Sequence, residues 1–324
     1  MPSRHQVDLS TRFTYHKRER ASRAIEKPDL DPVPEGMELA RNQMAKVVRE
    51  PYVPSKPLED AVNLAIALGR PLLLQGDPGA GKTRLAHAVA YSLGLPLEEC
   101  YIKSTSRAQD LLYTYDAVSR LYDVQLPPPQ HGAPTGSSPE PYVHYGGLGR
   151  AIIRASYGRR SVVLIDEIDK ADLDFPNDLL RELDGLEFEV RELGGKLWRA
   201  AKDRPDLRPI VIVTHNEEKP LPGAFLRRCV YHFVEFPKDK TFLEDVLAAH
   251  GVGGDGLGAR AVDVLLTLRK LELQKRPGLS ELLDWVGYLD AVSTDPEALA
   301  DLPYAGALIK NADDLKRVKP DPAR

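Results

Sequence analysis

The sequence predicts an α/β protein with a doubly wound parallel sheet, followed by a small helical domain. Three short apolar runs, at residues 71–74, 161–165 and 209–213, are bounded by turn residues, as buried parallel strands are. They alternate with segments whose apolar residues recur at helical spacing, which is typical of a parallel sheet covered by helices. After Pro237 the strand signals end, and helical patterns follow at residues 239–250, 258–273, 279–292 and 305–317.

Composition and size narrow the class of protein. The 324 residues, 42% hydrophobic and 28% charged, fit about two domains of ordinary globular composition. No apolar run reaches the length of about 18 residues that a membrane span needs, and the first residues lack the apolar segment of a secretory signal. Cys100 and Cys229 stand outside any paired metal or redox spacing, so we expect two reduced thiols in a cytoplasmic protein.

Three regions of the chain differ in character. Residues 1–50 are rich in charge, with seven Lys/Arg and three Asp/Glu among the first 27, and we expect a solvated extension there rather than a basic arm on an acidic partner. Residues 51–236 carry the alternating pattern, and residues 237–324 form the helical domain. Residues 117–147 interrupt the α/β pattern as an insertion, since ten of the fifteen residues 127–141 are Pro, Gly or Ser.

The first α/β unit contains a phosphate-binding motif. A helix predicted at residues 58–68 stops at Gly69, the strand at 71–74 follows, and a helix at 83–93 ends at Gly94. Between the strand and the second helix, GDPGAGKT fits GxxxxGK[ST], whose glycines let backbone N–H groups surround a phosphate. Lys82 would reach the β- and γ-phosphates, and the Thr83 hydroxyl would bind Mg²⁺. The predicted nucleotide-binding residues are Gly76, Asp77, Pro78, Gly79, Ala80, Gly81, Lys82, Thr83 and Arg84.

Two carboxylates follow the second buried strand. Asp166 and Glu167 come directly after four apolar residues, at the edge where ligands bind in open α/β sheets. Asp166 would hold Mg²⁺, which prefers carboxylate and phosphate oxygens. Glu167 would orient and deprotonate the attacking water. We expect Asp169 and Asp172 to be solvated residues of the following turn and helix.

The third strand ends in an amide and is followed by two arginines. Asn216 would either hold the attacking water or γ-phosphate, or serve as an Asx-turn cap; His215 is interpreted as a packed or surface neighbour. Arg227 and Arg228 are either a solvated helix end or an arginine finger, which would act in trans on the γ-phosphate of a neighbouring subunit.

The order of these motifs resembles AAA+ ATPases and, within them, the MoxR family. The resemblance covers about residues 51–315 and rests on LLLQGDPGAGKTRLAHAVA, IDEIDKAD and HNEEKPLPGAFLRR. It implies an ATP pocket at the residues above, with the finger at Arg228 and Arg227 as a helper. It also implies that Tyr52 and Val53 line the adenine pocket. The family has an arginine in its helical lid domain, but our alignment has Ser280 there. Either Arg276 or Lys275 substitutes for it, or the lid contact is lost.

The resemblance also predicts two hairpins. In the first, residues 120–126 and 142–145 would be the arms around the Pro-rich tip. In the second, residues 186–190 and 196–198 would flank Gly194 and Gly195. By resemblance, such loops face the central channel of a ring and grip a client protein; plain surface loops are the alternative.

The function implied is Mg²⁺-dependent hydrolysis of ATP to ADP and phosphate in a homo-oligomeric ring, a hexamer by resemblance. Its chaperone-like work would be to remodel a client protein, with a von Willebrand factor A-domain protein as a possible partner. One alternative is a nucleotide-gated scaffold with little turnover, although such a scaffold would not need Glu167. A nucleic-acid motor is disfavoured by the net charge of −4 and the pI of about 6.1.

Overall fold

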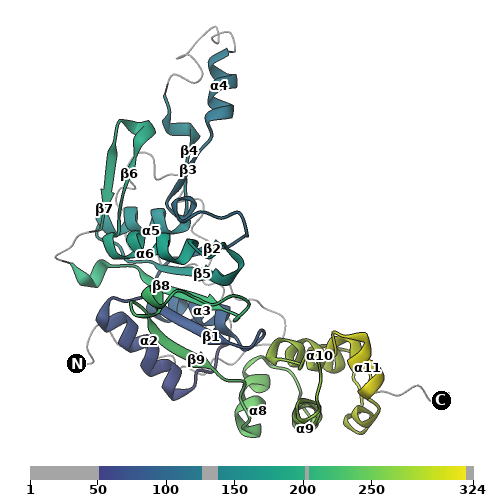
Figure 1. Ribbon diagram of the computed structural model, residues 1–324. Helices are drawn as coiled ribbons and strands as arrows, with labels where there is room; N and C mark the ends of the chain where they lie inside the picture. The colour runs from purple at the N-terminus through teal and green to yellow at the C-terminus, as the bar shows by residue number, and fades with distance from the viewer. Residues whose placement is uncertain (1–50, 126–137, 201–203, 319–324) are drawn as a thin grey trace.

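The computed structural model describes residues 51–125, 138–200 and 204–318. The extension predicted at residues 1–50 and most of the Pro-rich segment lie outside these ranges. A five-stranded parallel sheet with the order β2-β5-β8-β1-β9 forms the centre of the molecule (Figure 1). Its strands are β1 (Leu72–Gly76), β2 (Leu97–Tyr101), β5 (Val162–Asp166), β8 (Ile210–His215) and β9 (Val230–Val234).

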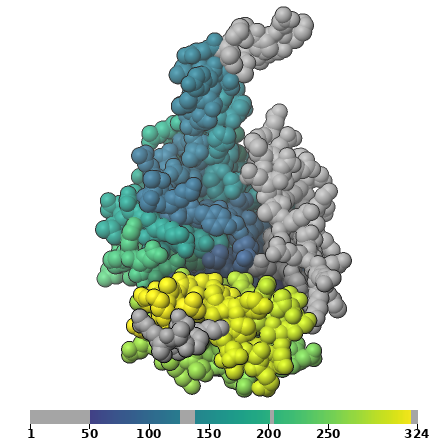
Figure 2. Space-filling view, turned by 90° about the vertical axis from the view of Figure 1, so that its right-hand side faces the viewer, coloured from purple at the N-terminus to yellow at the C-terminus, as the bar shows by residue number. Residues whose placement is uncertain are grey.

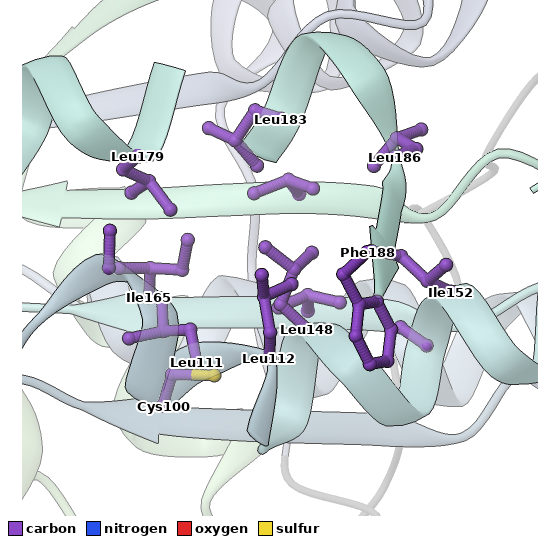
Figure 3. Close-up of a cluster of buried hydrophobic side chains, with 14 of the residues drawn as sticks. Cys100, Leu111, Leu112, Leu148, Ile152, Ile165, Leu179, Leu183, Leu186 and Phe188 are labelled. Atoms are coloured by element: carbon purple, nitrogen blue, oxygen red, sulfur yellow. The ribbon is translucent and has the colours of Figure 1, made fainter. Parts of the chain in front are cut away.

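Helices cover both faces of the sheet, because alternate strand residues point in opposite directions. Leu72 and Leu74 pack in a buried cluster with α2 (Lys56–Leu68) and α3 (Lys82–Leu93). Leu73 points to the other face, whose cluster includes α5 (Gly147–Ser156) and α6 (Phe175–Gly185). Figure 3 shows this second cluster, with side chains of both helices packed over the sheet. The doubly wound α/β architecture predicted from the sequence is therefore confirmed.

The strand register brings three loops to one edge of the sheet. Gln75 lies beside His215 in neighbouring strands, and Ile165 lies beside Val213. The residues after β1, β5 and β8 therefore emerge next to one another, which is where parallel sheets bind ligands.

Two antiparallel hairpins extend from the α/β core. β6 (Glu187–Val190) pairs with β7 (Lys196–Arg199), as predicted. In the other hairpin, β3 (Tyr113–Tyr115) pairs with β4 (Val143–Tyr145), which confirms the predicted second arm.

The predicted first arm of that hairpin, residues 120–126, is wrong. These residues fall largely in helix α4 (Ala117–Gln125), which lies at the far end of a projection from the core (Figure 1). Asp116 begins the helix, because its carboxylate accepts hydrogen bonds from the Ser119 N–H (2.9 Å) and hydroxyl (2.6 Å). None of the α4 residues is buried.

The C-terminal helices build a core of their own. α8 (Lys240–Ala249), α9 (Leu257–Lys270) and α10 (Leu279–Ala291) pack around the fully buried Trp285. They form the yellow-green lobe at the bottom of Figure 2. The helix predicted at 305–317 is instead a 3₁₀ turn at Ala305–Ala307 followed by α11 (Ala312–Val318). None of the helices in the described ranges is long and apolar enough to cross a membrane.

Candidate functional site

The loop between β1 and α3 is closely enclosed. Gly76 and Gly79 have φ angles of +147° and +76°, which residues with a side chain rarely adopt. A Cβ on Gly76 would come within 2.3 Å of the Val234 oxygen, and one on Gly79 within 2.8 Å of Ser280 Oγ. The loop opens into the N-terminus of α3, where backbone N–H groups and the helix dipole favour an anion.

Lys82 lies inside this loop. Its Nζ donates hydrogen bonds to the backbone oxygens of Gly76 (2.5 Å) and Asp77 (2.9 Å), and the residue is 5% exposed. Desolvation lowers the pKa of Lys82, while the charges of Asp77, Asp169 and Asp166 oppose that shift. Because its hydrogen-bond partners are neutral carbonyl oxygens, the ammonium keeps its charge available for a phosphate.

The predicted metal-binding residues lie together at the ends of α3 and β5. Asp166 Oδ1 accepts hydrogen bonds from Thr83 Oγ1 (2.9 Å) and from Thr214 Oγ1 (2.7 Å). Hydroxyl and carboxylate oxygens suit Mg²⁺, which completes its shell with phosphate oxygens and water. Within the described ranges, no group of three or more His, Cys, Asp or Glu could hold a metal ion. A metal ion at this site would therefore need phosphate oxygens and water as further ligands. Thr214, which sequence analysis did not single out, is the second partner of Asp166.

Glu167 turns sharply out of β5. Its backbone is in the left-handed region (φ 57°, ψ 56°), and its N–H donates to Thr214 Oγ1 at 2.7 Å. Its carboxylate accepts a hydrogen bond from Asn216 Nδ2 at 3.1 Å and forms an ion pair with Lys170. That pair raises the pKa of Lys170. The structure therefore brings the two predicted catalytic residues of neighbouring strands into contact.

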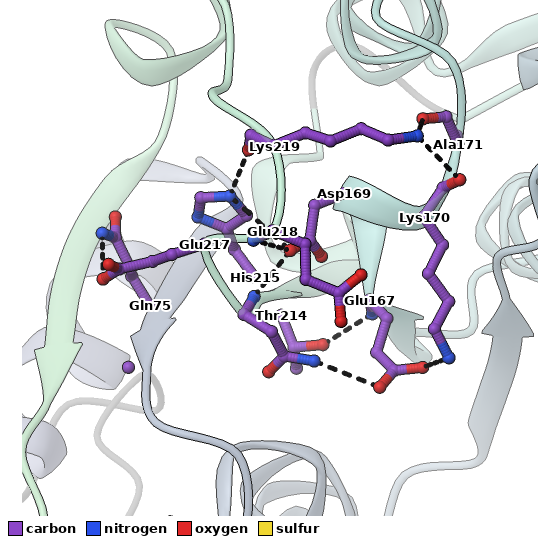
Figure 4. A network of polar contacts seen from close by, with 12 residues as sticks. Gln75, Glu167, Asp169, Lys170, Ala171, Thr214, His215, Glu217, Glu218 and Lys219 are labelled. Atoms are coloured by element: carbon purple, nitrogen blue, oxygen red, sulfur yellow. Dashed lines mark hydrogen bonds and ion pairs between the residues drawn. The ribbon is translucent and has the colours of Figure 1, made fainter. Parts of the chain in front are cut away.

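Asp169 is not the solvated residue that sequence analysis predicts. It is 3% exposed, and its Oδ2 accepts hydrogen bonds from the backbone N–H groups of Asn216 (3.1 Å) and Glu218 (2.9 Å). The loop after β8 closes over it, as Figure 4 shows. His215 is buried beside it, with Nε2 at 3.9 Å from Asp169 Oδ2. Asp172, in contrast, is exposed as expected.

A cleft of about 1440 Å³ runs from the phosphate-binding loop to the C-terminal helices. Thr83, Arg84, Glu167 and Asn216 line its polar end. Its other walls are largely apolar and come from both parts of the chain: Tyr52, Val53, Phe236, Pro237, Phe242, Val246, Leu279 and Leu283. Burial raises the pKa of Tyr52, so the phenol stays neutral. The cleft is large enough for a nucleotide, and its lining combines the phosphate-binding loop with apolar side chains.

The C-terminal helices touch the phosphate-binding loop through α10 and α9. Leu279 N donates to Gly79 O at 3.2 Å, next to Ser280. Neither Arg276 nor Lys275 is among the residues that line the cleft. Instead Arg269 of α9, which sequence analysis missed, lies 3.5 Å from the Asp77 carboxylate. No motif marks Arg269, because only the packing of α9 brings it there.

Arg228 lies at the opposite end of the sheet from the phosphate-binding loop. It precedes β9, whose first residue Val230 pairs with Leu72, whereas the loop follows Gly76 at the far end of β1. The intervening strand spans roughly 15 Å. Arg228 is exposed, pairs with Asp184 at 3.2 Å and borders a second cleft of about 500 Å³. Arg228 is therefore far from the site of its own chain.

About half of the chain matches a known protein family. Residues 71–229 match the family model of an AAA domain of the dynein-related subfamily. The matched range extends from β1 to the start of β9 and contains the phosphate-binding loop, both carboxylates, Asn216 and Arg228. None of the curated proteins matches the chain. The family match and the fold support an AAA+ ATPase.

Proposed function

We propose that this chain, which contains an AAA domain, hydrolyses ATP to ADP and phosphate with Mg²⁺ as cofactor. One observation carries the proposal: hydrogen bonds join Thr83, Asp166, Thr214, Glu167 and Asn216 at the mouth of the phosphate-binding loop. A cation site, a carboxylate and an amide thus meet where the γ-phosphate of a bound nucleotide would end.

Each side chain has a role that its position supports. Lys82 would bind the β- and γ-phosphates, and Thr83 and Asp166 would hold Mg²⁺, which neutralises phosphate charge when bound. Glu167 would accept the proton of the attacking water. The Asn216 amide, 3.1 Å from the Glu167 carboxylate, would fix the direction of that base.

The apolar end of the cleft supports a purine base. Val53 and Tyr52 both line the cleft and lie a few residues before α2. Flat apolar walls bind a base by stacking and by excluding water. Adenine is our choice of base because the AAA domain match supports ATP as the nucleotide.

We extend the proposal to a homo-oligomeric ring, a hexamer of the MoxR type, with the site at each interface. Arg228 lies too far from its own nucleotide to act there, so a neighbouring subunit would supply it. The ring would remodel a client protein in the cytoplasm, with a von Willebrand factor A-domain protein as partner. The exposed side chains of α4, Val118, Leu121, Tyr122 and Val124, support a protein contact at the first hairpin.

The dependence of ATPase rate on protein concentration tests this proposal. The specific rate of the wild-type chain should climb as subunits associate, and Arg228→Ala should lower it at least about 100-fold at every concentration. Arg227→Ala, at the adjacent exposed arginine, is the matched control and should lose less. A rate that is independent of concentration and of Arg228 would mean a self-sufficient site in one chain.

A further inference from the structure

We propose that Asp169 is a positioning residue, which holds the Asn216 loop so that the Asn216 amide meets Glu167. The inference rests on the proposed ATPase function. It assigns a role to a buried carboxylate that the chemistry above does not use. Asp169 lies two residues beyond Glu167, in the 3₁₀ turn Ile168–Lys170, and its partners lie after β8.

Asp169 links the turn after β5 directly to the loop after β8. Its Oδ2 accepts the backbone N–H groups of Asn216 (3.1 Å) and Glu218 (2.9 Å), and its side chain is 1% exposed. Hydrogen bonds to a buried carboxylate are among the stronger ones in proteins. Asn216 supplies both one of these N–H groups and the side-chain amide that contacts Glu167. By holding the Asn216 backbone, Asp169 therefore fixes the position of that amide.

Burial excludes a direct role for Asp169 in the reaction. Asp166, Glu167 and Asn216 are partly exposed, whereas the side chain of Asp169 is 1% exposed and does not line the nucleotide cleft. It therefore acts through Asn216 and does not touch the nucleotide itself.

The surrounding contacts point to the same function. Lys219 Nζ donates to Ala171 O at 2.7 Å, and its own backbone oxygen lies 2.9 Å from His215 Nε2 (Figure 4). These contacts tie the turn after β5 to the loop after β8 from a second side. Asp169 Oδ1 itself makes no hydrogen bond within the described structure. The link that Asp169 makes between the two loops therefore depends on Oδ2, the oxygen that accepts both N–H groups.

The two loops that Asp169 links each contain a residue with an unfavourable backbone conformation. Glu167 and Glu217 both lie in the left-handed region, with φ of 57° and 65°. Such residues persist only where the surroundings over-determine them. Asp169 lies two residues after Glu167, and its two hydrogen bonds come from the residues on either side of Glu217. Without it, both loops would gain freedom, and the Asn216–Glu167 contact would loosen.

Steady-state kinetics of Asp169→Ala and Asp169→Asn test the inference, with Asp172→Asn as the matched control in the same acidic stretch. Asp169→Ala should lower kcat about tenfold or more while KM for ATP changes less than about threefold. Asp169→Asn should keep part of the rate, because an amide oxygen still accepts a hydrogen bond. In an Asn216→Ala background, Asp169→Ala should cost less than about twofold more, since both act through one contact.

Amide hydrogen exchange gives a readout that does not need activity. The Asn216 and Glu218 amides should exchange faster in Asp169→Ala and stay unchanged in Asp172→Asn. Asp169→Ala with wild-type kcat, or with a loss that multiplies in full on Asn216→Ala, would overturn the inference. A similar fold-loss in kcat and in ATP affinity, together with a lower melting temperature, would also overturn it. An inactive wild-type chain would overturn the ATPase proposal as well, whereas an active chain insensitive to Asp169 overturns only this inference.

Discussion

Glu167 has a left-handed backbone conformation, which is unfavourable for residues other than glycine. Such a conformation costs on the order of 1–3 kcal/mol. Along a regular strand, Asp166 and Glu167 would point to opposite faces of the sheet. The left-handed turn instead lets Asp166 contact Thr83 while Glu167 contacts Asn216. The strain therefore directs two adjacent carboxylates to different tasks at one site.

Glu167→Gln separates hydrolysis from binding. The amide cannot accept the proton of the attacking water, so kcat should fall about 100-fold or more while the affinity for ATP changes only a few-fold. Single-turnover hydrolysis and equilibrium binding measure the two effects. Glu217→Gln is the matched control, because Glu217 is also left-handed but bonds to Gln75, and it should turn over like the wild type. A Glu167→Gln variant with normal turnover would contradict the assignment of Glu167 as the general base.

At the residue scale, sequence motifs predict the parts that are local along the chain. The phosphate-binding loop, Asp166 and Glu167 each lie in a contiguous signature, and the structure brings these segments together. The roles of Asp169 and Thr214 could not be predicted in this way, because they depend on contacts between distant segments. Asp169 stands in an acidic stretch and is buried only because a loop 47 residues further along closes over it. Nothing within a short window of sequence carries that information.

At the scale of elements, the three strands predicted are central, and the two missed, β2 and β9, are the edges of the sheet. An edge strand is covered less completely, so its sequence is more polar. β2 reads LEECY, and its Glu98 is only 5% exposed because Arg150 and Arg154, more than 50 residues away, pair with it. The sequence of β2 therefore shows no apolar pattern, and only the fold identifies it as a strand.

The contact of α9 with the phosphate-binding loop leads to a prediction for Arg269. Its guanidinium lies 3.6 Å from the centre of the Phe236 ring, donates to Pro277 O at 2.6 Å and lies 3.5 Å from Asp77. It thus joins the C-terminal helices to the connecting segment and to the loop. Arg269→Ala should weaken ATP binding about threefold to tenfold by loosening this junction, as measured by calorimetry. Arg260→Ala, an exposed arginine of the same helix, is the control and should bind ATP normally. Equal affinities for the two variants would contradict a role for Arg269.

At the scale of the whole molecule, the two ends of one sheet would carry complementary halves of a site in the proposed ring. The loop, Glu167 and Asn216 lie at the carboxyl end, and Arg228 lies at the other end beside a separate cleft. One chain cannot join these halves, but a head-to-tail arrangement of copies can, since the same two surfaces meet at every interface of a ring. The separation, fixed by the length of β1, is thus the physical reason to expect association.

Mixing two inactive variants tests that arrangement. Glu167→Gln subunits keep Arg228, and Arg228→Ala subunits keep Glu167, so a mixed interface in the correct order restores one complete site. In a random equal mixture, roughly a quarter of interfaces have that order, and the rate should recover to at most about a quarter of the wild-type value. Each variant alone, at the same total concentration, should stay near background. A mixture that associates but recovers no activity would contradict a shared site, whereas recovery requires that the two ends of the sheet act on one nucleotide from different chains.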